Sequence, residues 1–287
     1  MVRIDEHLAT PNNLNATRFH VVGRLATAMT ELRFDQPGFP PATLSHDKGV
    51  RFLHLGTTWV QGAMRLRDAD AIELEYVQTM MMWCLFESAP KHIVQLGLGS
   101  AALTKFCYHQ FKQARITAIE LNPNVIGACH HWFALPANDE RLQVLQMDAQ
   151  DFVQNSANHG QIDILQVDLY DAQARGPVLD SLDFYQACHA CLSQQGMLLV
   201  NIFGGRQAEN LARLEQIFDA VVWLSAEQDE NTVALAFKQS PQIDFSLLYA
   251  RARQINQDTG LRAKRWVLGL QAWMQGDQGV DGHLEKP

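Results

Sequence analysis

The chain has 287 residues, of which 47% are hydrophobic, and a formal net charge of -8 at pH 7. This length and hydrophobic content suffice for one large core or two smaller ones. The acidic balance argues against a nucleic-acid-binding protein, which would normally present a basic face.

No apolar run reaches the roughly 18 to 20 residues that span a bilayer, and the first residues lack the regions of a signal peptide. We therefore expect a protein of the cytoplasm that has no membrane partner. We also expect the cysteines to be reduced and mostly buried, without disulfides. The chain has five of them, which are Cys84, Cys107, Cys129, Cys188 and Cys191.

The N-terminal part predicts an arm followed by a small β domain. Residues 34–44, FDQPGFPPATL, are rich in proline and glycine and indicate a loop within an arm over 1–41. Segments between 42 and 66 carry β-branched and aromatic residues separated by glycines, which favours short antiparallel strands. Apolar residues at helical spacing over 71–87 predict a helix, so 42–88 is expected to be a β domain with a linking helix.

Beyond Pro90 the pattern changes to short apolar runs that alternate with amphipathic segments. The runs IVQLG, ITAIEL, LQVLQMD, IDILQVDLY and MLLVNIF predict parallel strands with helices on both faces. The runs AVVWLSAEQ and NTVALAFK are separated only by Asp229 and Glu230, which predicts an antiparallel hairpin.

An α/β domain whose mostly parallel sheet ends in such a hairpin resembles the class I methyltransferase-type Rossmann fold. We assign this domain to 89–240. The segment 241–287 is expected to hold C-terminal helices and a loose tail.

The turn after the first of these strands has the pattern of a ligand-binding loop. Gly97, Gly99 and Ala102 fit G-x-G-x-x-A, where small residues let the backbone approach a ligand. The alternative is a tight turn that holds no ligand. Glu120 lies 23 residues after Gly97, close to the spacing of roughly 20 expected for an acid that binds ribose hydroxyls.

Acidic residues also follow the third and fourth strands. Asp148, with Ala149 beside it, stands where methyltransferase-type folds commonly bind adenine, although Asp148 equally suits the N-cap of a helix. Asp168 and Asp171 follow the fourth strand, on the side where open α/β sheets bind ligands. A dinucleotide-dependent enzyme would share the glycine loop and Glu120, but it has no role for these later acids.

Taken in order, these segments resemble the polyamine aminopropyltransferases, the spermidine synthase family, over residues 53–238. The resemblance covers LHLGTTWVQG with Gln61, LEYVQTMM with Tyr76, the glycine-rich VQLGLGSAAL, AIELNPNVI, QMDAQDF and VDLYDAQARGP. It implies transfer of an aminopropyl group from decarboxylated S-adenosylmethionine to an amine such as putrescine. It also implies a homodimer or homotetramer. We expect no metal, because Cys188 and Cys191 have no obvious second pair of ligands nearby.

The resemblance assigns roles to individual residues. Asp168 matches the general base, Tyr76 is its hydrogen-bonding neighbour and Asp171 is the second acid of the loop. An ammonium group must lose a proton before it can attack, so a carboxylate beside it suits this chemistry. The expected donor-binding residues are Gln61, Gly97, Gly99, Ser100, Glu120, Leu121, Asp148 and Ala149.

Three departures concern the amine side. Ser100 stands where active family members usually carry an aspartate, and a hydroxyl cannot replace that charge. Val77 and Gln78 stand where the family often has His or Gln and then Glu, and DLYDA replaces DSSDP. Two alternatives therefore stay open: a methyltransferase that uses ordinary S-adenosylmethionine, and a non-catalytic nucleoside-binding homologue.

Overall fold

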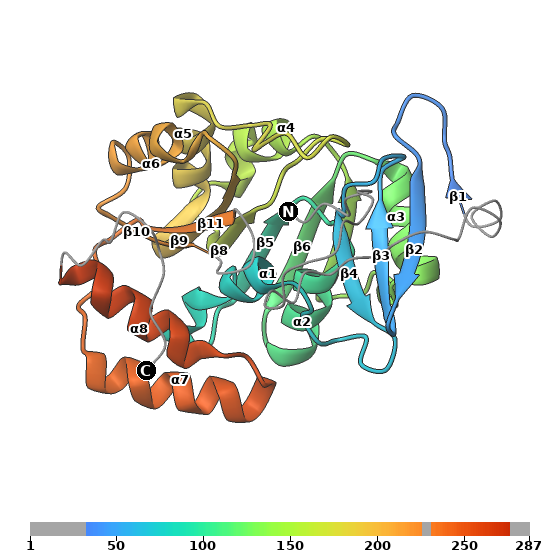
Figure 1. Cartoon of the computed structure of the whole chain (residues 1–287). Coiled ribbons are helices and arrows are strands. Elements are labelled where there is room, and N and C mark those ends of the chain that lie inside the picture. Colours follow the sequence, from blue (N-terminus) through green and yellow to red (C-terminus); the bar gives the residue numbers. More distant parts are fainter. Residues whose placement is uncertain (1–32, 226–230, 276–287) are drawn as a thin grey trace, which may run out of the picture.

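A sheet of seven strands forms the centre of the computed structural model, which describes residues 33–225 and 231–275. The strand order is β10-β11-β9-β8-β5-β6-β7 (Figure 1). Neighbours from β7 to β9 pair in parallel, whereas β11 pairs antiparallel with both β9 and β10. The strands are β5 (His92–Leu96), β6 (Arg115–Glu120), β7 (Leu142–Gln146), β8 (Ile162–Val167), β9 (Leu192–Phe203), β10 (Ala220–Ser225) and β11 (Asn231–Phe237).

The arrangement confirms the expected fold class, including the antiparallel pairing of the last two strands. Asp229 and Glu230, predicted to separate those strands, lie outside the described residues. So do residues 1–32 of the expected arm and the expected loose tail from 276 onward.

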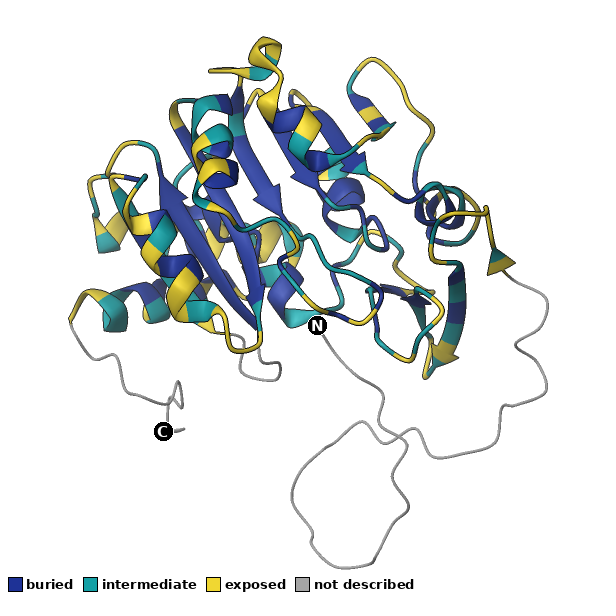
Figure 2. Cartoon of the chain, turned by 90° about the horizontal axis from the view of Figure 1, so that it is seen from above, coloured by how far each residue is buried: buried dark blue, intermediate teal, exposed yellow. Residues whose placement is uncertain are grey.

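Helices cover both faces of the sheet because successive strand residues point to opposite faces, and both faces are apolar. Ile93 belongs to a buried cluster on one face and Val94 to a second cluster on the other. Figure 2 shows the central strands buried along their length and the exposed residues on outward helix faces. The helices are α2 (Ala102–Gln110), α3 (Pro123–Trp132), α7 (Phe245–Thr259) and α8 (Ala263–Met274) on the first face, and α4 (Ala149–Gln154), α5 (Leu182–Cys191) and α6 (Gln207–Glu215) on the second. A short 3-10 turn, η2 (Ser156–Asn158), follows α4.

A second, smaller sheet packs beside α2 and α3 (Figure 1). Its strands are all antiparallel, as expected, and follow the order β1 (Arg33–Phe34), β2 (Ala42–Asp47), β3 (Val50–His54) and β4 (Gly62–Arg65). The loop predicted for 34–44 is too long, because β1 includes Phe34 and β2 begins at Ala42. Phe34 is held by its edge contact with the ring of Trp132 on α3, a tertiary contact that local composition does not encode.

The helix predicted over 71–87 is wrong in extent. The structure has α1 (Glu75–Thr79) and then a 3-10 turn, η1 (Met82–Leu85). The α-helical hydrogen bonding stops at Met80, whose carbonyl accepts from the Gln166 side chain at 2.8 Å. Tight backbone bonds follow, from Met81 to Gln78 and from Cys84 to Met81. A buried amide of β8 therefore ends the helix that periodicity alone would continue.

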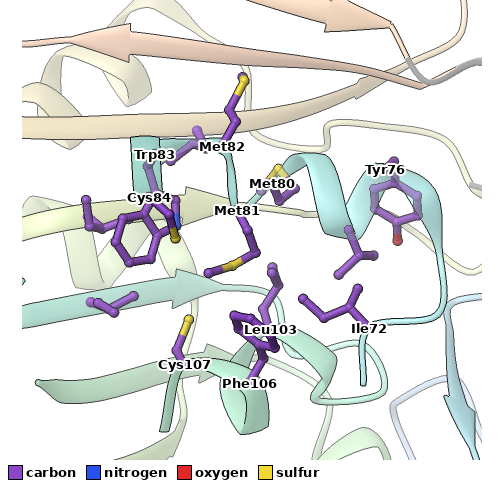
Figure 3. Close-up of a cluster of buried hydrophobic side chains, with 14 of the residues drawn as sticks. Ile72, Tyr76, Met80, Met81, Met82, Trp83, Cys84, Leu103, Phe106 and Cys107 are labelled. Carbon is purple, nitrogen blue, oxygen red and sulfur yellow. The ribbon is translucent and has the colours of Figure 1, made fainter. Parts of the chain in front are cut away.

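This broken segment packs against α2. Figure 3 shows Met80, Met81 and Trp83 on one side of a buried cluster and Leu103 and Phe106 of α2 on the other. All three residues of the first group have no exposed surface. The packing anchors the segment that directly follows α1.

All five cysteines are free and buried, and their predicted burial is confirmed. Within the described part of the chain, none of the helices is long and apolar enough to cross a membrane. The predicted domain boundaries after residues 88 and 240 fall in irregular segments and stay predictions.

Candidate functional site

The residues singled out in the sequence meet at one edge of the central sheet. Gly97 follows β5, Glu120 ends β6, Asp148 follows β7 and Asp168 follows β8. These four strands are neighbours and parallel, so their carboxyl ends lie side by side. The first prediction about the site, that these loops share one place, therefore agrees with the topology.

The glycine-rich loop needs its glycines for backbone reasons. Gly97 has φ +93°, and a Cβ there would lie 2.2 Å from the backbone oxygen of Asp168. Gly99 has φ +51°, and a Cβ there would lie 3.0 Å from the backbone oxygen of Gln61. Positive φ costs little only for glycine. The glycine-rich loop can thus lie directly between the loop that carries Asp168 and the small sheet.

Glu120 stands beside this loop. Its Oε2 accepts a hydrogen bond from the Leu98 amide at 3.1 Å, and its Oε1 accepts from the Asn122 amide at 2.8 Å. Burial raises the pKa of Glu120, and the hydrogen bonds from backbone amides oppose that rise. The next residue, Leu121, is an exposed apolar side chain. The Glu120 carboxylate suits contact with sugar hydroxyls, and the exposed Leu121 side chain suits contact with the face of an apolar ring.

Asp148 caps α4, as one of its two interpretations predicted. Its Oδ1 accepts from the Gln150 amide at 2.8 Å, and Ala149 is the buried first residue of the helix. Capping engages one carboxylate oxygen and fixes the direction of the other. The two interpretations are therefore compatible.

Asp168 lies at the centre of the edge. Its Oδ1 accepts from the Asn201 side-chain amide at 2.8 Å, and the Tyr76 hydroxyl donates to its Oδ2 at 3.4 Å. Burial raises the pKa of Asp168, and the bonds from Asn201 and Tyr76 offset only part of that rise. The pairing of Tyr76 with Asp168 agrees with the sequence expectation, across 92 residues of chain.

Sequence reasoning missed the amides behind Asp168. Asn201 of β9 and Asn231 of β11 have no exposed surface, and the Asn231 amide donates to the Asn201 carbonyl oxygen at 2.8 Å. The side-chain oxygen of Asn201 therefore points away from Asp168, and the side-chain nitrogen of Asn201 faces the carboxylate. The available signal was a polar residue inside each of two apolar strands, MLLVNIF and NTVALAF, since buried amides need partners.

Asp171 faces a different partner from Asp168. It forms a salt bridge with Arg175 at 2.7 Å and also accepts from the Gln173 amide. Burial opposes ionisation, but the hydrogen bonds from Arg175 and Gln173 outweigh it and lower the pKa of Asp171. Its backbone oxygen accepts from Gln61 at 3.1 Å. The carboxylate thus shapes the loop after β8.

The Ser100 side chain is hydrogen-bonded to the small sheet. It is only 3% exposed, and its hydroxyl donates to the Ala63 carbonyl of β4 at 3.1 Å. A Cβ at Gly62 would lie 2.6 Å from the Ser100 Cβ, so the two backbones meet closely here. The Ser100 side chain therefore links the glycine-rich loop to the small sheet.

A pocket opens between the small sheet, α1 and the glycine-rich loop. It brings together Gln61, Tyr76, Gly97, Ser100 and Asp168, whereas the predicted residues Glu120, Leu121, Asp148, Ala149 and Asp171 lie outside its lining. The described residues that line it are Gln61, Gly62, Ala63, Leu74, Tyr76, Val77, Gly97, Leu98, Gly99, Ser100, Ala102, Leu103 and Asp168.

No group of three or more His, Cys, Asp or Glu side chains is placed to hold a metal ion in residues 33–225 and 231–275.

Comparisons with known proteins agree with this geometry. Residues 75–219 match the model of the spermine/spermidine synthase domain. A polyamine aminopropyltransferase of Neisseria meningitidis serogroup A is 31% identical over 246 residues, which cover 84% of this chain and 93% of that protein.

Two solved structures show the same fold. A probable spermidine synthase from Corynebacterium glutamicum has a TM-score of 0.66 at 17% identity, covering 89% of this chain and 98% of its own. Human methyltransferase-like protein 13, solved in complex with SAH, has a TM-score of 0.57 at 20% identity, covering 64% of this chain and 92% of its own. At these identities, the two structures support the fold alone.

Proposed function

The chain belongs to the spermine/spermidine synthase family, and from that membership we propose that it transfers an aminopropyl group from decarboxylated S-adenosylmethionine to a primary amine. The observation that carries the proposal is Asp168, a carboxylate of raised pKa held by Asn201 and Tyr76 at the mouth of the glycine-rich loop. The acceptor is an amine of the putrescine type, and no metal takes part.

The donor's nucleoside fits the neighbouring strand ends. Glu120 lies beside the glycine-rich loop, where its Oε2 accepts from the Leu98 amide, and it would use its remaining acceptor capacity to bind the ribose hydroxyls. Asp148 would bind the adenine amino group through the oxygen that does not cap α4, with Leu121 and Ala149 beside the ring. Backbone groups of the glycine-rich loop would approach the sulfur side chain.

Gln61, Gly97, Gly99 and Ser100 would border the aminopropyl group, since all four line the pocket that Asp168 also reaches. These assignments use one edge of the sheet for the nucleoside and the adjoining pocket for the reacting atoms. The expected homodimer or homotetramer and the cytoplasmic location remain predictions beside them.

The reaction requires an amine with a free lone pair. Asp168 takes the proton from the acceptor ammonium, and the nitrogen then forms a bond to the carbon attached to sulfur. The carbon–sulfur bond breaks with its electron pair staying on sulfur, so methylthioadenosine leaves as a neutral thioether. Because that leaving group needs no acid, positioning and proton removal are the protein's tasks.

A raised pKa suits this role. A carboxylate whose ionised form is disfavoured by burial binds a proton more strongly than a solvated one. The Tyr76 hydroxyl donates to Oδ2 of Asp168, and it would also form a hydrogen bond with the incoming nitrogen. Asp171 would act through the loop, because its carboxylate is paired with Arg175.

Methyl transfer from S-adenosylmethionine is a second candidate, favoured by one specific observation. Ser100 stands where the family's acid for the aminopropyl ammonium is expected, and its hydroxyl is already bonded to Ala63. A donor that carries no aminopropyl cation to be transferred would not need that acid.

Calorimetric titration with decarboxylated S-adenosylmethionine, S-adenosylmethionine and methylthioadenosine separates the candidates. Preference for the decarboxylated donor supports aminopropyl transfer, and preference for the carboxylated one supports methylation. Binding without turnover of either donor supports the non-catalytic homologue, and absence of binding refutes all three. The Asp168→Asn variant should bind the donor as the wild type does and lose turnover; retained turnover would refute the assignment of the base.

A further inference from the structure

The loop of residues 66–74 joins two walls of the pocket beside Asp168. It leaves β4, whose Gly62 and Ala63 line the pocket, and it leads into α1, whose Tyr76 lines the pocket as well. The Tyr76 hydroxyl is also the donor to the Asp168 carboxylate. The position of this loop therefore affects both the width of the pocket and the hydrogen bond to the base.

A lysine of α2 is buried against this loop. Lys105 is only 1% exposed, and its ammonium donates to the Ala69 carbonyl oxygen of the loop at 2.6 Å. Burial lowers the pKa of Lys105 to about 8, which leaves the amine mostly protonated at pH 7. The groups that face the amine and oppose this fall in pKa are Asp70 of the loop, Cys129 of α3 and Asp68 of the loop. The ammonium is thus bonded to the loop and attracted by its two acids.

A fully buried ammonium costs free energy that an apolar side chain would not. Lysine is almost never fully buried unless it is paired, because removing its charge from water is unfavourable. An apolar side chain of similar length would fill the space between α2 and the loop without this cost. What Lys105 adds is a hydrogen bond of defined length and direction to one backbone atom, the Ala69 oxygen. This contribution is one of position.

Two other contacts between the loop and α2 fix its position less well. Ile72 belongs to the same buried cluster as Leu103 of α2 (Figure 3), but apolar packing has no preferred direction. His109 of α2 is 3.5 Å from Asp70, yet both side chains are partly exposed, so solvent weakens the pair. Of these three contacts, the bond from Lys105 is the one that is both buried and directional.

The helix that carries Lys105 begins at the glycine-rich loop. Ala102 and Leu103 form its start and line the pocket, and the Lys105 backbone amide donates to the Ala101 carbonyl at 3.0 Å. Lys105 therefore lies one helical turn beyond the glycine-rich loop, and its side chain connects that loop to the wall formed by α1.

From this arrangement we propose that Lys105 is a positioning residue for the amine side of the reaction, which holds the 66–74 loop and the start of α1 in place beside the glycine-rich loop. The inference rests on the proposed amine transfer and adds to it a residue that touches neither substrate. The effect of Lys105 passes through Tyr76, into which the loop leads. The nucleoside edge at Glu120 and Asp148 lies outside this connection.

The Lys105→Met variant keeps the length of the side chain and removes its donor. With the purified full-length protein, decarboxylated S-adenosylmethionine and putrescine at pH 7, we expect the KM for the amine to rise about 10-fold, because the wall that borders the acceptor is no longer fixed. The dissociation constant of methylthioadenosine, measured by calorimetry, should stay unchanged. An unchanged KM, or an equal loss of nucleoside binding, would overturn the inference.

Two further variants of α2 identify the cause. Lys105→Arg keeps a cationic donor at the same position and should retain most of the wild-type KM. His109→Ala removes the exposed contact with Asp70 and should leave the KM unchanged. A defect in Lys105→Arg equal to that of Lys105→Met, or an equal defect in His109→Ala, would overturn the assignment to the bond from Lys105.

Hydrogen–deuterium exchange keeps this test separate from the proposed function, because it needs neither ligand nor turnover. The backbone amides of Ala71 and Gln78 donate to Asp68 and Leu74. In Lys105→Met these two amides should exchange about 10-fold faster than in the wild type, whereas the amides of β5 should not change. If exchange rises in this way but the wild type transfers no group, the tether is supported and the proposed function fails alone. Unchanged exchange in the loop, or an equal rise in β5, would overturn the inference.

Discussion

Replacing Asn201 by leucine should raise the pH at which Asp168 becomes a base. The wild-type amide donates to the Asp168 Oδ1 at 2.8 Å, and Asn231 holds its carbonyl on the other side. The donor stabilises only the ionised carboxylate. Without it, burial acts unopposed on that oxygen, and the pKa of Asp168 rises further.

The size of the effect follows from the kind of bond that is lost. A hydrogen bond to a charged group contributes about 1.5 to 3 kcal/mol, which corresponds to roughly a 10- to 100-fold change in the proton-binding equilibrium. On the acidic limb of the pH profile, where few Asp168 carboxylates are ionised, kcat/KM should fall by about the same factor. At alkaline pH the variant should approach the wild type.

The assay is a pH profile of kcat/KM for amine transfer. Tyr170→Phe is the control, because the Tyr170 hydroxyl donates to the Asn201 backbone oxygen at 2.8 Å and not to the carboxylate. It should lower the melting temperature without moving the acidic limb. The double variant Asn201→Leu, Asn231→Leu removes both buried amides, so it should recover stability but keep the shifted limb.

An unchanged acidic limb in Asn201→Leu, with the fold intact, would refute the reasoning. The Asn201 amide would then be a structural partner of Asn231 only, and Asp168 would owe its ionisation to another group.

Three further outcomes are expected. Burial raises the pKa of Asp168 above its ordinary value of 3.8, so between these two pKa values the native state binds more protons than the unfolded state, and stability falls as the pH rises. The Asp168→Asn variant should therefore melt about 2 to 4 °C higher than the wild type at pH 7 for each kcal/mol recovered. Near pH 3 it should melt no higher. Gly97→Ala should abolish turnover, since its Cβ would meet the Asp168 backbone, whereas Gly204→Ala, with φ +77° and no atom within 4 Å, should only lose stability on thermal melting. Burial lowers the pKa of Lys105 to about 8, so wild-type stability relative to Lys105→Met should increase from pH 8 to 10.5, and a constant difference in melting temperature would contradict this.

The sequence identified those candidate site residues whose position follows from the end of a predicted strand. Glu120 and Asp168 close apolar runs, and parallel strands bring their carboxyl ends to one edge whatever the rest of the fold does. Gly97 could be singled out because a tight turn between strand and helix needs its backbone freedom. Asp148 stayed divided between capping and binding, since residue type serves both.

The sequence could not show the groups that act from a distance. Asn201 and Asn231 are 30 residues apart and meet because β11 pairs antiparallel with β9. The helix over 71–87 ends early because the Gln166 side chain, 86 residues from Met80, takes over its carbonyl. Neither event has a local pattern, since both are bonds between buried amides that only the packed sheet brings into reach.

By itself, then, the sequence determined the alternating strands and helices, the glycine-rich turn and the acids at the strand ends, because these follow from local periodicity and spacing. The tertiary structure decided that Asp168 is buried beside Asn201, that the Ser100 hydroxyl is bonded to Ala63, and that Val77 faces the same pocket. Burial and hydrogen-bond partners depend on which elements pack together, so local sequence patterns do not encode them.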